Sequence, residues 1–320
     1  MILGKFMPVH KGHQYLIDFA REQVECLTVI VGTLASEPIP GELRYEWVKE
    51  LYPDVNVQHC TDENPQYPHE HTDFWNIWVE SIRKFIPEGP DVVFTSEDYG
   101  EELARRLGAK HILCDLSRSC IPVSATKIRE NPYENWQYIP EPVRPYFTRR
   151  VVIYGPESTG KSTLAEKLAT HYQTVWVPEF ARHYLDNKGA WVELSDIEKI
   201  AEGQIASEES LARQANRLLI CDTELITTCV YSRHYFGECP AEVEQKADQR
   251  QYDLYLLLDI DVPFVADWQR PDANSREEFF DTFRGELERR GHRYTVISGS
   301  YEERFAQAVK AIDAIFQTLD

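Results

Sequence analysis

The chain has 320 residues, 34 lysine and arginine residues against 53 aspartate and glutamate residues, a net charge of −19 and a hydrophobic fraction of 42%. This length predicts about two domains, and the composition is typical of a folded globular chain rather than a disordered one. The negative charge argues against sequence-independent binding of nucleic acid, because such a surface repels the phosphate backbone.

Cysteine usage and hydropathy indicate the compartment. The seven cysteines are scattered and contain no C-x-x-C pair, which fits a reducing environment and disfavours a structural zinc site. No apolar run approaches the roughly 20 residues that a membrane span needs, and the sequence does not open on a cleavable signal. We therefore expect a cytoplasmic protein without membrane insertion or a nucleic-acid partner, and we leave self-association into a homo-oligomer open.

The first half of the chain alternates short β-branched runs with amphipathic stretches. The spacing predicts a helix over residues 73–86 and strands at residues 27–31, 55–58, 92–95 and 111–114. A further strand, which is very short, is expected at about residues 1–3. This βαβ alternation predicts a parallel sheet of the Rossmann type.

A proline-rich stretch then interrupts the alternation. Four prolines fall between Asn131 and Pro145 and break any long helix, so we expect a domain boundary between residues 147 and 148. A second α/β alternation follows, with strands predicted at residues 151–154, 175–177, 218–221, 254–258 and 294–297. Three Ser-x-x-Glu pairs predict capping boxes at helix starts: Ser195/Glu198, Ser275/Glu278 and Ser300/Glu303.

The first motif that carries chemistry joins the first strand to the first helix. Gly4-Lys-Phe-Met-Pro-Val-His-Lys-Gly-His13 places His10 and His13 near a helix start. Imidazoles there can donate hydrogen bonds to a triphosphate as negative charge builds on departing pyrophosphate. An H-x-x-H pair can alternatively ligate a metal, but no third ligand stands beside these two.

A second phosphate clamp is predicted near the end of the same half. Val123-Ser-Ala-Thr-Lys-Ile-Arg129 offers hydroxyls, backbone donors at a helix start and two cations. A Ser/Thr-rich helix start is by itself more often only a cap. Its pairing with the upstream histidine motif favours phosphate binding.

The second half carries a phosphate loop. Gly155-Pro-Glu-Ser-Thr-Gly-Lys-Ser162 fits G-x-x-x-x-G-K-[ST] between a predicted strand and a predicted helix. In such a loop the backbone amides wrap a phosphate, Lys161 reaches the β- and γ-phosphates, and Ser162 ligates Mg²⁺. The motif therefore predicts a kinase or another ATP-dependent phosphoryl-transfer enzyme.

Two acids and three arginines complete the predicted phosphoryl-transfer machinery. Asp222 ends a strand where a metal-anchoring acid is expected, and Glu179 ends the preceding strand, where it can accept a proton from a substrate hydroxyl. Either acid can instead be a plain helix cap. The arginines lie in a polar stretch that can close over ATP, or can be solvated helix charge: Arg270, Arg276 and Arg284.

Together these motifs resemble those of the NadR family. Gly4 to His13 resembles the nucleotidylyltransferase signature G-x-F-x-P-x-H-x-G-H, Val123 to Arg129 resembles its I-S-x-T-x-I-R signature, and a phosphate loop follows. The resemblance spans nearly the whole chain. It implies an NMN (nicotinamide mononucleotide) adenylyltransferase domain over residues 1–147, joined to a P-loop ribosylnicotinamide kinase domain over residues 148–320. Such an enzyme converts nicotinamide riboside to NMN and then to NAD, with ATP as co-substrate and Mg²⁺ as cofactor.

The motifs and the resemblance together give the expected site residues. The expected catalytic residues are His10, His13, Arg129, Lys161, Glu179 and Asp222, with Ser162 and Asp222 as Mg²⁺ ligands. ATP in the transferase would contact Gly4, Lys5, Phe6, His10, Gly12, His13, Ser124, Thr126 and Arg129. ATP in the kinase would contact Gly155, Pro156, Glu157, Ser158, Thr159, Gly160, Lys161, Ser162, Thr163 and Arg270. The nicotinamide substrates would contact Trp75, Trp78, Glu179 and Arg182, although both tryptophans also fit the apolar stripe of a core helix.

Other readings stay open from sequence alone. Some NadR proteins carry an N-terminal helix-turn-helix repressor domain, and we expect this chain to be a form without it. A sulfurylase joined to an adenylylsulfate kinase also pairs H-x-x-H with a phosphate loop, but its transferase half is larger. A riboflavin kinase/FAD synthetase lacks this loop. A non-catalytic NAD or ATP sensor would not require the groups that act on the transition state, such as Lys161.

Overall fold

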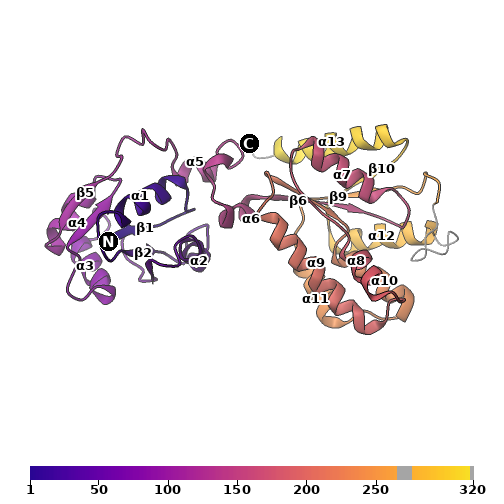
Figure 1. Ribbon diagram of the computed structural model, residues 1–320, viewed down its shortest axis with the longest axis horizontal. Helices are drawn as coiled ribbons and strands as arrows, with labels where there is room; N and C mark the ends of the chain where they lie inside the picture. Colours follow the sequence, from indigo (N-terminus) through magenta and orange to yellow (C-terminus); the bar gives the residue numbers. More distant parts are fainter. Residues whose placement is uncertain (265–275, 318–320) are drawn as a thin grey trace. The chain divides into compact units, whose positions relative to one another are not determined.

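Parallel β-sheets organise both halves of the chain (Figure 1). The computed structural model describes residues 1–264 and 276–317 and divides into two units, Met1–Val143 and Arg144–Asp320. The boundary expected between residues 147 and 148 coincides with the end of α6 (Arg144–Phe147), a short helix at the start of the second unit.

The first unit contains five short strands. They are β1 (Ile2–Gly4), β2 (Thr28–Gly32), β3 (Asn56–Cys60), β4 (Val92–Thr95) and β5 (Lys110–Leu113). β2 pairs in parallel with both β1 and β3, and β4 pairs in parallel with β5. The amide of Phe94 donates to the carbonyl of Met1 at 2.9 Å and so brings β4 beside β1. The resulting strand order is β3-β2-β1-β4-β5. The chain adds β2 and β3 on one side of β1 and then crosses to add β4 and β5 on the other side, as in doubly wound nucleotide-binding folds.

Helices cover both faces of this sheet. They are α1 (Lys11–Arg21), α2 (Gly41–Leu51), α3 (Phe74–Phe85), α4 (Gly100–Leu107) and α5 (Ala125–Glu130), followed by the 3-10 turns η1 (Trp136–Tyr138) and η2 (Glu141–Val143). Ile82 of α3 and Leu103 of α4 pack with Ile30 of the sheet on one face. On the other face, Tyr45 of α2 stacks on His59 of β3. The predicted helix over residues 73–86 is α3.

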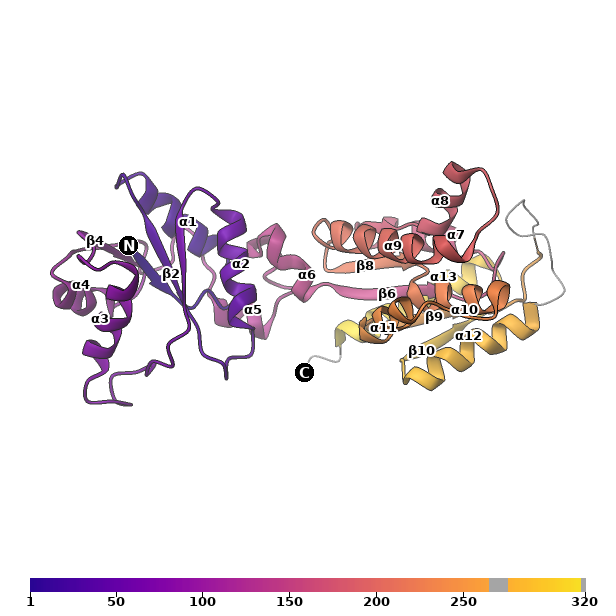
Figure 2. The ribbon, with the colours of Figure 1, turned by 90° about the horizontal axis from the view of Figure 1, so that it is seen from below.

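The second unit has one five-stranded parallel sheet. Its strands are β6 (Arg149–Tyr154), β7 (Trp176–Val177), β8 (Leu218–Asp222), β9 (Leu254–Leu258) and β10 (Tyr294–Ile297), in the order β10-β9-β6-β8-β7. Figure 2 shows β8, β6, β9 and β10 side by side in this order. The phosphate-loop strand β6 therefore lies at the centre of the sheet, beside β8.

Alternation of apolar residues along β6 explains how this sheet is covered. Val151 and Ile153 pack toward α7 (Lys161–His171) and α13 (Tyr301–Gln317), whereas Val152 and Tyr154 pack toward the opposite face. Figure 1 shows α7 and α13 on one side of the sheet, with α9, α10 and α11 on the other. The remaining helices of this unit are α8 (Phe180–Lys188), η3 (Leu194–Asp196), α9 (Ile197–Ala212), α10 (Leu225–Phe236), α11 (Ala241–Gln249) and α12 (Arg276–Arg290).

The predicted fold class, a Rossmann-like domain followed by a P-loop α/β domain, is confirmed. Of the capping boxes, the one at Ser300 and Glu303 forms, with hydrogen bonds of 2.8 and 3.3 Å. The box at Ser195 is wrong, because η3 starts earlier and is capped by Glu193 and Asp196 instead. The pair that begins at Ser275 starts outside the described residues. Of the described helices, none has the length and apolar character that a bilayer crossing requires.

Candidate active sites

The first site lies at the carboxyl ends of β1, β4 and β5. The loop after β1 leads into α1, and His10 is the N-cap residue of that helix. Its Nδ1 accepts hydrogen bonds from the amides of Gly12 (3.1 Å) and His13 (3.3 Å), while Nδ1 of His13 accepts from the amide of His10 (3.3 Å). The two rings stack with their centroids 3.7 Å apart. The histidines thus form a reciprocal capping box that fixes both rings.

This arrangement determines the protonation of both imidazoles. Burial, helped by the nearby charge of Arg118, lowers the pKa of His10 to about 4, and burial lowers the pKa of His13 well below its usual value. Both rings are therefore neutral at pH 7. Because each Nδ1 accepts a backbone hydrogen bond, each ring carries its proton on Nε2. The pair offers two uncharged N–H donors to an anion.

Residues from three further segments complete the cleft around these histidines. Ser96 and Glu97 follow β4, Asp115 follows β5, and Ser124 caps α5 by accepting from the amide of Lys127 at 3.2 Å. The lining of the cleft comprises His10, Gly12, His13, Tyr15, Leu16, Ser96, Glu97, Cys114, Asp115, Arg118, Ile121, Val123, Ser124, Ala125 and Thr126. The two motifs predicted from sequence to form one phosphate site therefore meet in one cleft.

Position 12 requires glycine because the His10 ring lies close to the backbone there. A Cβ atom there would come within 2.9 Å of the His10 ring. That ring must stay close to the chain at this point, because it accepts the amide hydrogen of Gly12 itself. The H-x-G-H spacing thus serves the capping box as well as the ligand.

Four of the residues expected to bind ATP in the transferase lie outside the cleft lining. Lys5 pairs with Glu37 at 3.0 Å, and Phe6 is buried with its ring 4.8 Å from that of His13. Gly4 packs closely on the Phe6 ring. Arg129 donates to the carbonyl of Met7 at 2.5 Å and to the hydroxyl of Thr126 at 3.2 Å. In this structure Arg129 thus ties the second motif to the loop of the first.

The two predicted nicotinamide-binding tryptophans lie on α3 and are both half-buried. Trp75 packs against the core beside Phe74. Trp78 donates its indole N–H to the carbonyl of Pro65 at 2.8 Å, and its ring lies over Gly32 at the end of β2. Trp78 is therefore placed at the carboxyl edge of the sheet, whereas Trp75 contributes to packing.

The second site lies at the carboxyl edge of the other sheet. The loop from Gly155 to Gly160 connects β6 to α7, and both of these glycines have positive φ, of 129° and 85°. The ammonium of Lys161 donates to the carbonyls of Gly155 (2.9 Å) and Pro156 (2.8 Å), and Thr159 donates to Pro156 at 2.9 Å. A phosphate would offer this ammonium a stronger, charge-assisted partner at the same loop. Thr163 follows in the first turn of α7 and is exposed.

A hydroxyl and a carboxylate meet beside this loop. Ser162 Oγ, in the first turn of α7, donates to Asp222 Oδ2 at 2.5 Å, because β8 lies next to β6 in the sheet. The side chain of Asp222 is buried. Hydroxyl and carboxylate oxygens are the ligands that Mg²⁺ prefers, so the donor set fits the predicted metal.

A second cleft opens from Lys161 toward α8 and α10. Glu157 and Glu179 contribute carboxylates to its lining, and Glu179 is the N-cap residue of α8. The rest of the lining is largely apolar and aromatic: Ala181, Leu185, Trp191, Val192, Ile197, Ile200, Gln204, Thr223, Thr227, Thr228, Tyr231 and Tyr235. Arg182 is half-buried in the first turn of α8 and is outside this lining.

The aromatic wall of this cleft was missed by the sequence analysis. The rings of Trp191 and Tyr235 meet edge to face at 5.6 Å, and Tyr231 stacks on Tyr235 at 6.0 Å. Trp191 lies between α8 and η3, whereas the tyrosines lie on α10. Their spacing in the sequence carries no motif, so only the fold brings them together.

The structure separates the three predicted lid arginines. Arg270 lies outside the described residues. Arg276 donates to the carbonyls of Val262 (3.0 Å) and Ser158 (3.4 Å), and so contacts the phosphate loop directly. Arg284 lies farther along α12 and pairs with Asp281 at 2.8 Å on the exposed surface. Of the two described arginines, Arg276 is therefore the one at the site.

A buried arginine holds the phosphate loop in place through hydrogen bonds. Arg304 of α13 is 2% exposed and donates to the carbonyls of Thr159 (2.8 Å), Asp259 (2.9 Å) and Gly299 (2.9 Å). It also pairs with Asp261. A single arginine in a helix gives no sequence signal for such a role.

Glu224 is the other residue whose role only the structure reveals. Its carboxylate caps α10 by accepting from the amides of Ile226 (2.7 Å) and Thr227 (3.3 Å). Burial raises the pKa of this carboxyl to about 8, although the two hydrogen bonds oppose the shift. The protonation of Glu224 therefore affects the stability of α10, which lines the second cleft.

The comparisons with known proteins agree with this geometry. NadR of Escherichia coli K12, a trifunctional NAD biosynthesis/regulator protein, is 32% identical over 98% of this chain and 82% of its own length. The nicotinamide-nucleotide adenylyltransferase of Pyrococcus furiosus is 28% identical over 46% of this chain and 80% of its own length. Residues 150–304 match a family model described as an AAA domain. A solved NadR protein in complex with NR superposes with a TM-score of 0.82 at 23% identity, over 98% of this chain and 95% of its own.

Fold and sites together define a nucleotidyltransferase joined to a P-loop kinase. Each of the two sheets carries a phosphate-binding arrangement at its carboxyl edge. The chain belongs to the NadR family.

Proposed function

We propose that the two units catalyse consecutive steps of NAD biosynthesis. The second unit phosphorylates the 5′-hydroxyl of nicotinamide riboside with ATP to give NMN, and the first unit adenylylates NMN to NAD with release of pyrophosphate. The observation that supports this most is the presence of two separate phosphate-binding arrangements in one chain of the NadR family. The family relationship favours this function over a sulfurylase or a non-catalytic sensor.

In the transferase, the phosphate of NMN attacks the α-phosphorus of ATP directly and pyrophosphate leaves. Nε2–H of His10 and of His13 donates to the triphosphate, and these bonds strengthen as charge builds on the leaving group. Arg118 and the hydroxyls of Ser124 and Thr126 line the same cleft and hold further phosphate oxygens. Arg129 acts by keeping the two motifs together.

In the kinase, the protein's own groups position the acceptor and stabilise the transferred phosphoryl group. Lys161 holds the β- and γ-phosphates, and Arg276 approaches from α12. Glu179 lines the cleft together with Lys161 and accepts the proton of the 5′-hydroxyl. Asp222 is engaged with Ser162, and this pair would hold Mg²⁺. When bound, Mg²⁺ would neutralise charge on the phosphates.

The aromatic wall of the second cleft suits the nicotinamide ring. Nicotinamide riboside carries a cationic pyridinium, and the faces of Trp191, Tyr231 and Tyr235 attract such a cation. In the transferase, Trp78 at the carboxyl edge of the sheet is the better placed of the two predicted tryptophans. Arg182, Gly4, Lys5 and Phe6 remain candidates for contacts that form only with ligand bound.

The reactions also define the expected partners and compartment. ATP, nicotinamide riboside, NMN and NAD are the small molecules that the two clefts would bind. We place the reactions in the cytoplasm, because seven cysteines, odd in number and scattered along the sequence, fit a reducing compartment.

The direct test is to incubate the purified chain with Mg-ATP and nicotinamide riboside and to follow the products by chromatography. NMN should appear first and NAD should follow. One ATP should be converted to ADP, and a second ATP should pass its adenylyl group to NMN as pyrophosphate is released. Formation of adenylylsulfate from sulfate and ATP, with no NMN or NAD, would instead support the sulfurylase reading.

A single variant tests the proposed base. Glu179→Gln keeps the shape of the side chain but cannot accept the proton, so kcat of the kinase should fall about 10²-fold with little change in KM. Glu198→Gln, which removes an exposed carboxylate from the first turn of α9, is the matched control. Equal losses in both variants would remove Glu179 from this role.

A further inference from the structure

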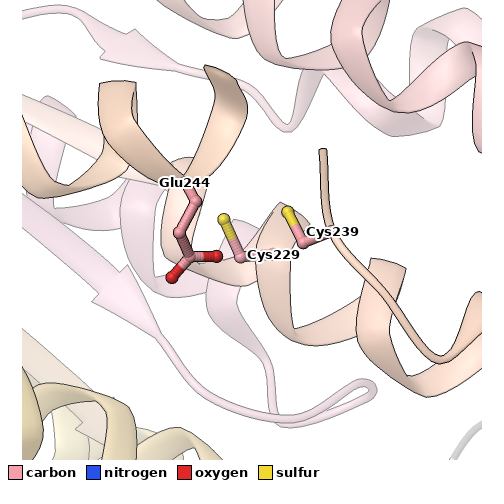
Figure 3. A group of neighbouring side chains, drawn as sticks. All are labelled: Cys229, Cys239 and Glu244. Carbon is pink, nitrogen blue, oxygen red and sulfur yellow. The ribbon is translucent and has the colours of Figure 1, made fainter. Parts of the chain in front are cut away.

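Two cysteines that the proposed reactions do not use lie side by side in the second unit. Cys229 is on α10, Cys239 is in the loop before α11, and Glu244 is on α11 (Figure 3). The two sulfurs and a carboxylate oxygen all lie within 4.8 Å of one another. Cys229 is fully buried, whereas Cys239 is half-exposed. Cys239 is thus the more accessible residue of the pair.

The charges around this cluster disfavour a metal cation. Both oxygens of Glu244 already accept hydrogen bonds from Arg233, at 2.6 and 2.5 Å, and the same carboxylate pairs with Arg290. Arg289 lies 3.4 Å from it. A Zn²⁺ ion would have to displace these guanidinium groups to recruit Glu244, and would then lie beside three positive charges.

The same surroundings favour a thiolate. The hydrogen bond from Cys229 lowers the pKa of Cys239 and outweighs burial and the Glu244 carboxylate, which oppose the shift, while the charge of Arg233 acts with the hydrogen bond. The pKa of Cys229 is correspondingly raised. Because Cys239 is also the more exposed of the two residues, it is the nucleophile of the pair and Cys229 is the resolving thiol.

We propose that Cys229 and Cys239 form a reversible disulfide on oxidation by a peroxide, and that this bond weakens binding of the nucleoside acceptor in the kinase cleft. The Cys239 thiolate attacks one oxygen of hydrogen peroxide and becomes a sulfenic acid as hydroxide leaves. The Cys229 sulfur then attacks the Cys239 sulfur, and water departs with the Cys229 proton. Two thiols and one peroxide thus give one disulfide and two water molecules. A dithiol reverses the reaction.

The local backbone permits this bond. The sulfurs must approach from within 4.8 Å to about 2.05 Å. Cys239 lies in the short connection after Gly237, which ends α10 with a φ of 76°, so this loop and Cys229 of α10 share the movement. The hydroxyl of Ser232 already holds this loop to α10 through the carbonyl of Glu238, at 2.7 Å.

Helix α10 carries the effect to the acceptor cleft. Cys229 follows Thr228 directly and precedes Tyr231 by two residues, and both of these neighbours line the cleft. A pull on Cys229 toward the loop turns or shifts this part of α10 and misplaces the aromatic wall. The phosphate loop lies on another element, so ATP binding should change less than acceptor binding.

The modification is tested by mass spectrometry on the full chain, independently of any activity. Treatment with hydrogen peroxide should remove two hydrogen masses, and peptide mapping should find Cys229 linked to Cys239. Cys239→Ser and Cys229→Ala should each abolish the link, whereas Cys26→Ser should retain it. A link between other cysteines, or stoichiometric zinc released on thiol blocking, would overturn the assignment.

The kinetic consequence rests on the proposed function and has an internal control. Oxidation should raise KM for nicotinamide riboside about tenfold, and dithiothreitol should restore it. NMN adenylylation by the same oxidised sample should be unchanged. Unaltered KM in a sample shown by mass to be fully linked would overturn the coupling. A reduced chain that makes no NMN would instead refute the proposed kinase, while the mass measurement still decides the disulfide.

Discussion

The two phosphate-binding sites hold negative charge by different chemical means. In the first unit, two neutral imidazoles present N–H donors, and their charge state is set by burial and by a reciprocal capping box. In the second unit, a permanent ammonium is held at the centre of a glycine loop, with Arg276 beside it. Neutral donors can stabilise a departing pyrophosphate without trapping it, whereas a kinase gains from full charges against a transferred phosphoryl group.

The same contrast reaches the stability of the two units. Burial lowers the pKa of His10 to about 4, while burial raises the pKa of Glu224 to about 8. Both residues are N-cap residues of a helix that borders a cleft. Rising pH should therefore stabilise the first unit through His10 and destabilise the second unit through Glu224. This predicts separate pH responses within one chain.

The largest expected effect comes from removing the ammonium. Lys161→Ala should lower NMN formation at least about 10³-fold, because nothing replaces the charge at the β- and γ-phosphates, and should leave adenylylation of supplied NMN unchanged. Both rates are measured on one preparation by chromatography. Lys167→Ala, which removes an exposed charge from the same helix, serves as the control.

The reverse separation is expected for the imidazoles. His13→Ala should lower adenylylation of NMN about 10²-fold or more, since it removes one N–H donor and one side of the capping box, and should spare the kinase. His69→Ala, in an exposed loop of the same unit, should behave like the unaltered chain. Loss of both activities in a folded variant at either site would show that the two sites are not independent.

A smaller effect should separate two arginines of α12. Arg276→Ala should lower kcat of the kinase about tenfold to 10²-fold, because Arg276 contacts the phosphate loop, whereas Arg284→Ala should change it little. Steady-state kinetics with saturating ATP measure this difference. Similar losses for the two variants would indicate that the total positive charge of α12 affects the reaction, and not the contact that Arg276 makes with the phosphate loop.

The smallest expected effect is on stability and depends on pH. The folded chain keeps the Glu224 proton up to about pH 8, and the unfolded chain releases it near 4.5, so this contribution is full below 4.5 and is lost as pH rises through 8. His10 binds its proton less readily when folded, so its contribution is full above 6.5 and is lost as pH falls through 4.

Calorimetry between pH 5 and pH 8 should therefore show the two units moving in opposite directions, by a few degrees in Tm. Glu224→Gln retains an acceptor for the helix cap but cannot ionise, and should flatten the response of the second unit. A steep fall with rising pH in that variant would assign the effect to other groups.

Local motifs made much of both sites predictable. The phosphate loop could be assigned from its own residues, and the strand that ends at Asp222 could be placed beside it because parallel strands share a carboxyl edge. The histidine motif and Ser124 are more than a hundred residues apart, yet their common phosphate chemistry predicted that they would meet.

What could not be predicted depends on packing between distant segments. Trp191 and Tyr231 belong to different elements, and nothing in their spacing shows that they share a wall. The neutral state of His10 follows from burial, which no motif encodes. Local patterns can also compete: Ser195 fits a capping box, but Glu193 and Asp196 cap an earlier turn.

Arg304 has a consequence for the timing of ATP capture. One buried guanidinium joins the phosphate loop at Thr159 to the chain after β9 at Asp259 and to the turn before α13 at Gly299. The phosphate loop is thereby held by two neighbouring connections before the nucleotide arrives. Little conformational entropy is then lost on association. Encounter should proceed as docking to a rigid receptor, with the slower adjustments left to the acceptor side of the cleft.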